Sequence, residues 1–190
     1  MTDYEVFYPE TTADWRRWLE QHHLSRKGVW IVFYRKSSGR TSLTWSDAVD
    51  AALCFGWIDS KKIRIDDQTS HQFFSKRKAG SMWSAINKNK VIRLTSDGLM
   101  APAGLDSIRQ AQEDGSWTLL DTVEALVLPT DLLEALQAFA GAEAYFHSLS
   151  KTTRKMLLQW LVLARRPETR QKRVAEIARN AFQQQKPKGF

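Results

Sequence analysis

The sequence predicts an α+β fold, with a small antiparallel sheet that contains a hairpin in the first half and a helical second half. Three observations predict it. Residues 29–34 are a β-branched and aromatic run, residues 57–65 alternate with the period of a strand, and the segments after residue 129 repeat apolar side chains at helical spacing. Strands in one half and helices in the other indicate α+β architecture rather than repeated βαβ units.

The first predicted elements are a helix over residues 11–23, with Thr12 as its cap, and a strand over residues 29–34. Residues 4–8 have strand character and can pair with that strand as an edge. Side chains at i, i+3 and i+4 give the helix one apolar face. These side chains are Trp15, Trp18 and Leu19.

A second helix begins at the capping pair Thr44 and Asp47 and ends at Gly56. The alternating strand 57–65 follows at once, and residues 70–78 can return beside it as the second arm of a hairpin. The polar turn between the arms is made of Asp66, Asp67 and Gln68.

The remaining segments are predicted as helices, the first of them capped by Ser81 or Ser84. Their ranges are 84–98, 102–115, 131–139, 142–149, 151–165 and 167–182. The apolar stripes of the last helices predict a core rather than a cofactor site. They comprise Leu133, Leu136, Phe139, Met156, Leu157, Trp160, Leu163, Val174, Ile177, Ala178 and Phe182. We expect an α+β core over residues 1–125 and a helical part over 126–190, packed on the same domain.

Composition limits the classes of protein to consider. The single cysteine, Cys54, excludes an internal disulfide framework, and four scattered histidines show no zinc spacing, so we expect no metal and no cofactor. The N-terminus has neither a secretory signal pattern nor a membrane-spanning apolar run, which predicts a cytoplasmic protein.

The formal charge of +7 is concentrated in two segments. Residues 59–93 hold 9 bases and 3 acids, residues 150–190 hold 11 and 2, and all other positions hold 8 and 16. This asymmetry suggests an anionic partner, and a solvated basic face on amphipathic helices is the simpler alternative.

The basic loop before the third helix is the main candidate binding site. Lys76, Arg77 and Lys78 precede a serine-capped helix start, where free backbone N–H groups favour an anion. The predicted ligand-binding residues are Trp57, Asp59, Lys76, Arg77, Lys78, Ser81, Trp83, Ser84 and Asn87. In the alternative interpretation the two tryptophans are core residues and the serines and the asparagine only brace the loop. If the site is real, alanine at the three basic positions abolishes anion binding and leaves the fold intact.

Two other residues have reactive side chains. Cys54 lies near the C-terminal end of its helix, where the dipole opposes a thiolate, so we interpret it as a structural thiol. Asp59 has no structural role in the sequence pattern and is the only candidate catalytic residue. The pair Asp66 and Asp67 suits a turn better than a metal site.

Several motifs resemble those of the bacterial YdeI/OmpD-associated family, also described as bacteriocin-protection proteins. The motifs are FGWID at 55–59, SMWSAIN at 81–87 and RPETR at 166–170, and the resemblance extends over nearly the whole chain. It implies association with a porin or with tolerance to bacteriocins and cationic peptides, and it brings no catalytic residue or cofactor. Since we find no export signal, direct porin binding does not fit the sequence.

We therefore predict an accessory protein that binds a small anionic ligand or a protein partner in stress or antimicrobial-peptide tolerance. The first alternative is an enzyme on a phosphorylated or carboxylated metabolite, with Asp59 as its acid–base group. The second is a nonspecific nucleic-acid binder that uses the basic segments, with weak and salt-dependent affinity. The sequence leaves the ligand and the oligomeric state open.

Overall fold

A computed structural model describes residues 4–187 and 189. The chain forms two compact units, residues 1–117 and 118–190, so the division comes before the one expected at residue 125. The reason is that the ring of Trp117 packs against Trp83 in the first unit, with ring centroids 5.0 Å apart. The following helix, Asp121–Glu124 (α5), packs against α8 (Lys151–Val162) of the second unit.

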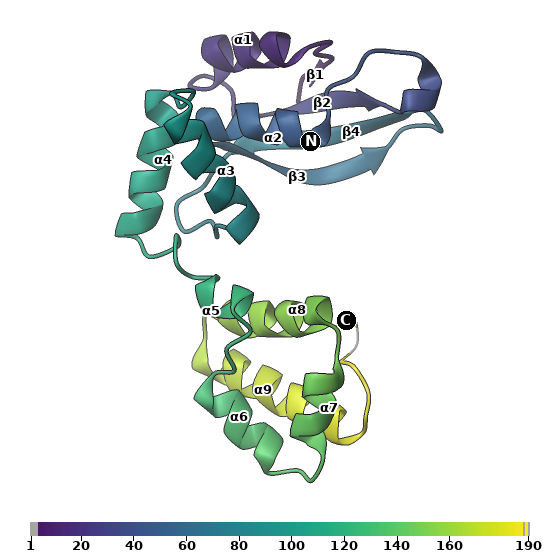
Figure 1. The fold of residues 1–190 in the computed structure, drawn as a ribbon, viewed down its shortest axis with the longest axis vertical. Helices are drawn as coiled ribbons and strands as arrows, with labels where there is room; N and C mark the ends of the chain where they lie inside the picture. The colour runs from purple at the N-terminus through teal and green to yellow at the C-terminus, as the bar shows by residue number, and fades with distance from the viewer. Residues whose placement is uncertain (1–3, 188, 190) are drawn as a thin grey trace. The chain divides into compact units, whose positions relative to one another are not determined.

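The first unit contains a four-stranded sheet in the order β1-β2-β4-β3 (Figure 1). The strands are β1 (Val6–Phe7), β2 (Gly28–Tyr34), β3 (Trp57–Arg64) and β4 (Thr69–Lys76). β3 and β4 form the predicted hairpin, and β2 pairs antiparallel with β4. β1 is an edge strand as expected, but it runs parallel to β2, so the sheet is mixed rather than antiparallel. A bulge interrupts β3 between Asp59 and Lys62.

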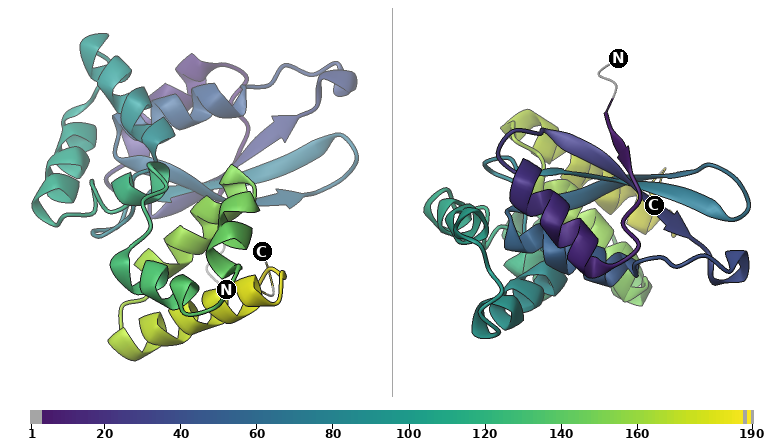
Figure 2. Two further views of the ribbon diagram at one scale, coloured as in Figure 1. Left: turned by 60° about the horizontal axis from the view of Figure 1, so that its bottom comes forward. Right: turned by 90° about the horizontal axis from the view of Figure 1, so that it is seen from above.

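The helices of the first unit are α1 (Thr12–His22), α2 (Trp45–Cys54), α3 (Ala85–Ser96) and α4 (Pro102–Glu113), with a short 3-10 turn at Lys36–Ser38. α1 and α2 pack side by side over one face of the sheet, and the outer ends of the strands extend past them (Figures 1 and 2). Apolar and aromatic side chains fill the layer between helices and sheet. The fully buried ones include Trp15, Leu19, Val29, Ile31, Trp57 and Phe74.

The caps follow the predicted chemistry, with two corrections. Thr11, not Thr12, caps α1, because its hydroxyl accepts from the N–H of Asp14 while the Asp14 carboxylate accepts from Thr11. Thr44 caps α2 as predicted. Ser84 caps α3, so Ser81 is not a helix cap.

The turn between α2 and β3 requires a glycine. Gly56 has φ +71°, and a Cβ at this position would lie 2.9 Å from the carbonyl oxygen of Ala103 in α4. Gly104, also in α4, lies against the carbonyl of Cys54. α4 therefore packs on the α2–β3 joint at backbone distance, which explains both glycines.

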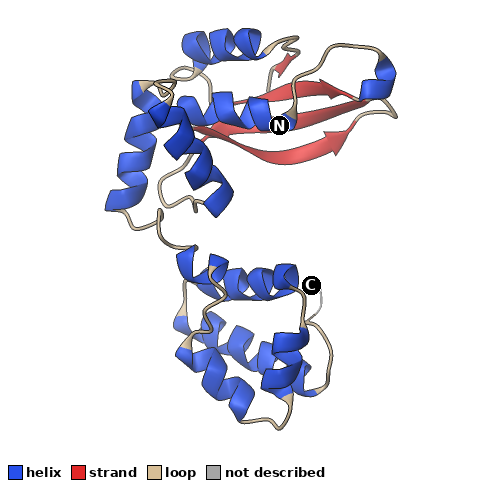
Figure 3. Ribbon diagram, viewed as in Figure 1, coloured by secondary structure: helices blue, strands red, loops and turns tan. Residues whose placement is uncertain are grey.

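The described residues of the second unit form helices joined by loops, with no strand among them (Figure 3). After α5 come α6 (Thr130–Gln137), α7 (Ala142–Ser148), α8 (Lys151–Val162) and α9 (Pro167–Phe182), which confirms the four predicted helices. The apolar stripes are partly wrong, since four of their side chains are 39–53% exposed: Phe139, Met156, Leu163 and Phe182. Five stripe residues are buried as predicted: Leu136, Leu157, Val174, Ile177 and Ala178. Leu132, Leu158 and Leu161, which the stripes did not include, are buried as well. Across both units, no helix in the described part of the chain has the length and apolar character to span a bilayer.

Candidate functional site

The two tryptophans of the predicted site are core residues. Trp57 is 0% exposed and its indole N–H donates to the carbonyl of His23 at 3.3 Å. Trp83 is 2% exposed and packs against Trp117. Neither ring presents a face to solvent, as the interpretation of the two tryptophans as core residues expects.

The three consecutive basic residues have different environments. The ammonium of Lys76 donates to the carbonyl of Leu24 at 2.7 Å, whereas Lys78 is exposed. The guanidinium of Arg77 lies 3.7 Å from the centre of the Trp83 ring and donates to the carbonyl of Met82 at 3.0 Å. Burial lowers the pKa of Arg77 to about 10, a shift opposed by the negative charge of Asp59. The run is therefore not a single cationic patch.

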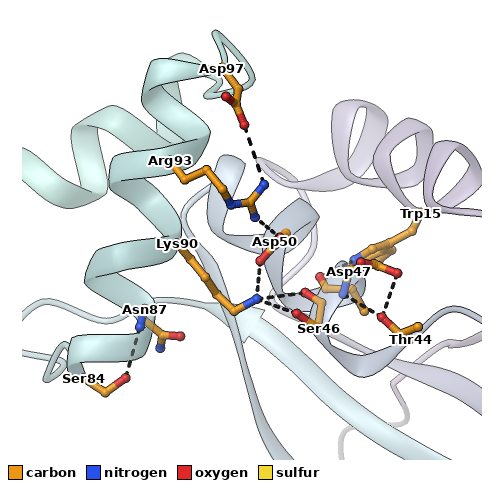
Figure 4. A network of polar contacts seen from close by, with 11 residues as sticks. Trp15, Thr44, Ser46, Asp47, Asp50, Ser84, Asn87, Lys90, Arg93 and Asp97 are labelled. Carbon is orange, nitrogen blue, oxygen red and sulfur yellow. Dashed lines mark hydrogen bonds and ion pairs between the residues drawn. The ribbon is translucent and has the colours of Figure 1, made fainter.

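Ser81, Ser84 and Asn87 brace the loop. The Ser81 hydroxyl accepts from the backbone N–H of Lys78 at 3.1 Å. The Ser84 hydroxyl accepts from the backbone N–H of Asn87 at 3.3 Å, which is the N-cap of α3 (Figure 4). These contacts match the bracing alternative considered for the sequence.

Asp59, the only catalytic candidate, has a structural role. Its Oδ2 accepts from the indole N–H of Trp45 at 2.9 Å and from the Gln72 amide at 3.3 Å. The half-buried carboxylate thus joins the start of α2 to β3 and β4. Cys54 is 1% exposed, and burial raises the pKa of its thiol, which agrees with a structural thiol.

A polar network between α2 and α3 is absent from the sequence-based expectations. Asp50 forms ion pairs with Lys90 and Arg93, and the Lys90 ammonium also donates to the Ser46 hydroxyl at 2.7 Å (Figure 4). The side chains of Asp50 and Lys90 are only 18% and 14% exposed. All of these contacts join residues of α2 to residues of α3, which are too far apart in the sequence for a local pattern to connect them. The network therefore fixes α2 beside α3.

The sequence analysis did not predict a cavity on the outer part of the sheet, which we call the outer groove. It has a volume of about 530 Å³ and is lined by the end of β2, the second half of β3, the first half of β4 and the segment that leads into α2. We define it by the apolar side chains Phe33, Leu43 and Trp45 and the basic side chains Arg35, Lys62 and Arg64. Such a volume is typical of small-molecule sites.

Strand alternation builds the outer groove. Lys62 pairs with Gln72 and Arg64 with Ser70, and these two β4 residues pair in turn with Ile31 and Phe33 of β2. All six positions therefore lie on the helix-covered face. Ile31 belongs to the core, and the other five line the outer groove. The alternation of residues 57–65 could have indicated Lys62 and Arg64, but the bulge and the distant Trp45 could not be placed from sequence.

The basic residues of the second unit are partly engaged within that unit. Arg170 makes a bidentate contact with Asp131, with N–O distances of 2.7 and 2.9 Å, and this hydrogen bonding lowers the pKa of Asp131. Arg173 lies over the ring of Trp160, and Lys155 pairs with Glu124. In the RPETR motif, Pro167 begins α9 and Arg170 ties it to α6, so the motif has a structural explanation.

No group of three or more metal-ligating histidine, cysteine or acidic side chains occurs among residues 4–187 and 189. The predicted ligand residues are thus divided among a core, a braced loop and a hydrogen-bonded carboxylate. The structure instead brings together the outer groove from β2, β3 and the segment that leads into α2.

Comparisons with known protein families give two matches. Residues 7–107 match a family described as a domain of unknown function, DUF8412. Residues 125–184 match the family described as bacteriocin-protection, YdeI or OmpD-associated. Neither the curated proteins nor the solved structures gave a match.

The second match confirms the resemblance found in the sequence, but only for the helical unit. The FGWID and SMWSAIN motifs lie in the first match, and RPETR lies in the second. Since the first match spans more than half of the 190 residues, the chain belongs to the DUF8412 family and carries a YdeI/OmpD-associated region at residues 125–184.

Proposed function

We propose that this YdeI/OmpD-associated accessory protein binds a small anionic ligand with an apolar or aromatic body in the outer groove. The single observation that carries the proposal is the joint lining of one 530 Å³ cavity by three basic and three apolar side chains. Apolar walls with a few placed polar groups are characteristic of ligand sites.

The charge of the outer groove supports an anion. Lys62 and Arg35 have no carboxylate partner in the described part of the chain, and Arg64 pairs with Asp67 only at the exposed turn. Asp66 also borders the cavity, but its Oδ1 already accepts from the backbone N–H groups of Gln68 and Thr69 at 2.7 Å. The net field over the outer groove is therefore positive.

Trp45 supplies the apolar contact. Its side chain is 50% exposed, which is unusual for a large aromatic residue, and its N–H is held by Asp59. The hydrogen bond limits the motion of the ring before a ligand arrives, so less conformational entropy is lost on binding. Phe33 and Leu43 extend the apolar surface.

Phenyl phosphate is a suitable probe, with inorganic phosphate and phenol as the charge-only and ring-only controls. We expect calorimetry to show tighter binding of phenyl phosphate than of either control. Lys62→Gln and Trp45→Ala should each weaken it about 5- to 30-fold, the effect of losing a charged hydrogen bond or a stacking contact.

Lys61→Gln is the matched control, because Lys61 precedes Lys62 in the same strand and does not border the outer groove. Equal losses from Lys61→Gln and Lys62→Gln would show that only the general positive field matters and would refute a site in the outer groove.

We propose that this binding serves tolerance to bacteriocins or other antimicrobial peptides. The description of the family matched by residues 125–184 supports this physiological role. A strain that lacks the protein should be more sensitive to such peptides, and the Lys62→Gln, Trp45→Ala double variant should fail to restore tolerance while Lys61→Gln restores it. Full rescue by the double variant would separate tolerance from the outer groove.

A further inference from the structure

A second cavity lies within the helical unit, between α5, α8 and the start of α6. It has a volume of about 240 Å³, and all of its lining residues belong to the second unit. We call it the α5–α8 groove and define it by Val123, Val127, Pro129, Leu158, Val162 and Arg170. It shares no residue with the outer groove, so it can take a separate ligand.

The walls of the α5–α8 groove are aliphatic. Val123 and Leu158 are 4% and 2% exposed, whereas Val127 is 53% exposed. Such walls favour the hydrocarbon part of a ligand, because removing apolar surface from water is favourable. Drug-sized ligands occupy cavities of about 300–1,000 Å³, so the volume of this groove indicates a smaller molecule.

A strained turn forms one rim of the groove. Leu126 has φ +57°, a left-handed conformation that is uncommon for a residue other than glycine. The backbone N–H of Leu126 donates to the carbonyl of Val123 at 3.1 Å, and that of Val127 donates to the carbonyl of Thr122 at 2.9 Å. Residues in such conformations are concentrated at sites that hold ligands. Here the turn places the half-exposed Val127 where a ligand would cover it.

The charge of Arg170 is already compensated. Its Nε and Nη2 donate to the Asp131 carboxylate at 2.7 and 2.9 Å. Its Nη1 makes only a 3.4 Å contact with the carbonyl of Leu161, which leaves an N–H for a further acceptor. A second carboxylate beside this pair would be repelled by Asp131, whereas a neutral oxygen would not.

We propose that the α5–α8 groove binds a small uncharged aliphatic molecule with a carbonyl oxygen. The aliphatic walls contact its hydrocarbon chain, and the oxygen accepts a hydrogen bond from Nη1 of Arg170. This ligand differs in charge from the anion proposed for the outer groove, and its site does not depend on that proposal.

The test uses 2-heptanone as the probe and heptanoate, which has the same chain length and a negative charge, as the control. Methyl NMR of the full chain follows the resonances of the valines and the leucine of the groove. We expect a Kd of about 0.1–1 mM for 2-heptanone, in the range of small ligands, and NOEs between its alkyl protons and these methyl groups. Heptanoate should bind at least about fivefold more weakly, because its charge has no free partner.

Two variants assign the binding to the groove. Val162→Phe fills the space and should weaken binding of 2-heptanone about tenfold or more. Leu163→Phe is the matched control, because Leu163 is the next residue, is 46% exposed and does not border the groove. Val127→Ser changes an exposed wall position that the fold does not need, and it should weaken binding about three- to tenfold.

Asp131→Asn tests the role of charge. Without the carboxylate, Arg170 lacks a counter-ion, so heptanoate should now bind more tightly than 2-heptanone. A purely structural role of Asp131 would weaken both probes alike. Because the two probes are compared on the same variant, its intrinsic stability does not affect the ratio.

Three results would overturn the proposal. Equal affinities of the wild type for the two probes would remove the selection for an uncharged ligand. Unchanged binding by Val162→Phe, or the absence of NOEs to the groove methyl groups, would place the probe elsewhere. A preference for 2-heptanone that persists in Asp131→Asn would refute the contact between Arg170 and the carbonyl oxygen.

Discussion

The indole N–H of Trp45 donates to Oδ2 of Asp59 at 2.9 Å, and this contact joins the first turn of α2 to β3 at the margin of the outer groove. The same oxygen accepts from Gln72, which is 4% exposed. Asp59 therefore positions the Trp45 ring at the outer groove and accepts a hydrogen bond from the amide of the buried Gln72.

We predict that Asp59→Ala lowers the free energy of unfolding by about 1–2 kcal/mol, because two donors lose their shared acceptor. Asp59→Asn keeps an acceptor oxygen and should cost less than about 1 kcal/mol. Urea unfolding followed by tryptophan fluorescence measures both values. A loss from Asp59→Ala below a few tenths of a kcal/mol would contradict the structural role and reopen the catalytic one.

Arg77 and Lys78 should differ strongly although they are neighbours. Arg77→Ala removes the stacking on Trp83 and the bond to Met82, so we expect a loss of about 2–3 kcal/mol. Lys78→Ala, at an exposed position, should change stability by less than about 0.5 kcal/mol. Chemical denaturation of the two variants measures both values, and equal losses would contradict the different environments of the two side chains.

Gly56→Ala and Gly80→Ala separate backbone strain from steric contact. Both glycines have a left-handed φ, +71° and +72°, but only Gly56 has backbone within 3 Å of an added Cβ. Gly80→Ala should cost about 1–2 kcal/mol from conformation alone, and Gly56→Ala about 1–3 kcal/mol more. Equal Tm shifts for the two variants would mean that α4 moves away from the joint without cost.

The contact between Arg170 and Asp131 predicts a pH dependence in the second unit. Hydrogen bonding from Arg170 lowers the folded-state pKa of Asp131. The stabilisation is thus fully present above the unfolded pKa of about 3.9 and is lost as the pH falls through the lowered folded pKa. Since both side chains are partly exposed, we expect only about 0.5–1 kcal/mol.

Urea unfolding followed by circular dichroism at several pH values measures the contribution of the Arg170–Asp131 contact to stability. The gap in stability between wild type and Asp131→Asn should narrow from about pH 5 to pH 3. Glu134→Gln, on the same helix, should show no comparable change. A gap that stays constant over this range would show that Asp131 contributes through packing rather than through charge.

Much of the fold follows from local rules. The capping pair of Thr44 and Asp47, the stop at Gly56 and the alternation from Trp57 are set by neighbouring residues, so sequence patterns predict them. The parallel pairing of β1 depends on a distant strand and has no local signal. Phe139 and Phe182 remain exposed and pack on each other, with ring centroids 5.4 Å apart, and helical periodicity does not reveal this pairing.

The sequence could predict the chemistry of the candidate site but not its position in the fold. The residues of the first unit suggested a basic and aromatic site that binds an anion. The outer groove, which we propose as the binding site, also combines basic and aromatic side chains. Its position depends on which face each strand presents after the bulge, and on a tryptophan brought from the start of α2. These are tertiary relationships, and no spacing along the chain encodes them.

The bulge in β3 has a consequence for how this protein behaves at high concentration. β3 is the outer strand of the sheet, and an exposed strand edge can recruit a strand from another molecule. The irregular register between Asp59 and Lys62 breaks the row of backbone donors and acceptors, and Lys61 and Lys62 place like charges where a second copy would have to pair. The strand that gives the outer groove its charge is thereby also protected against intermolecular sheet growth and aggregation.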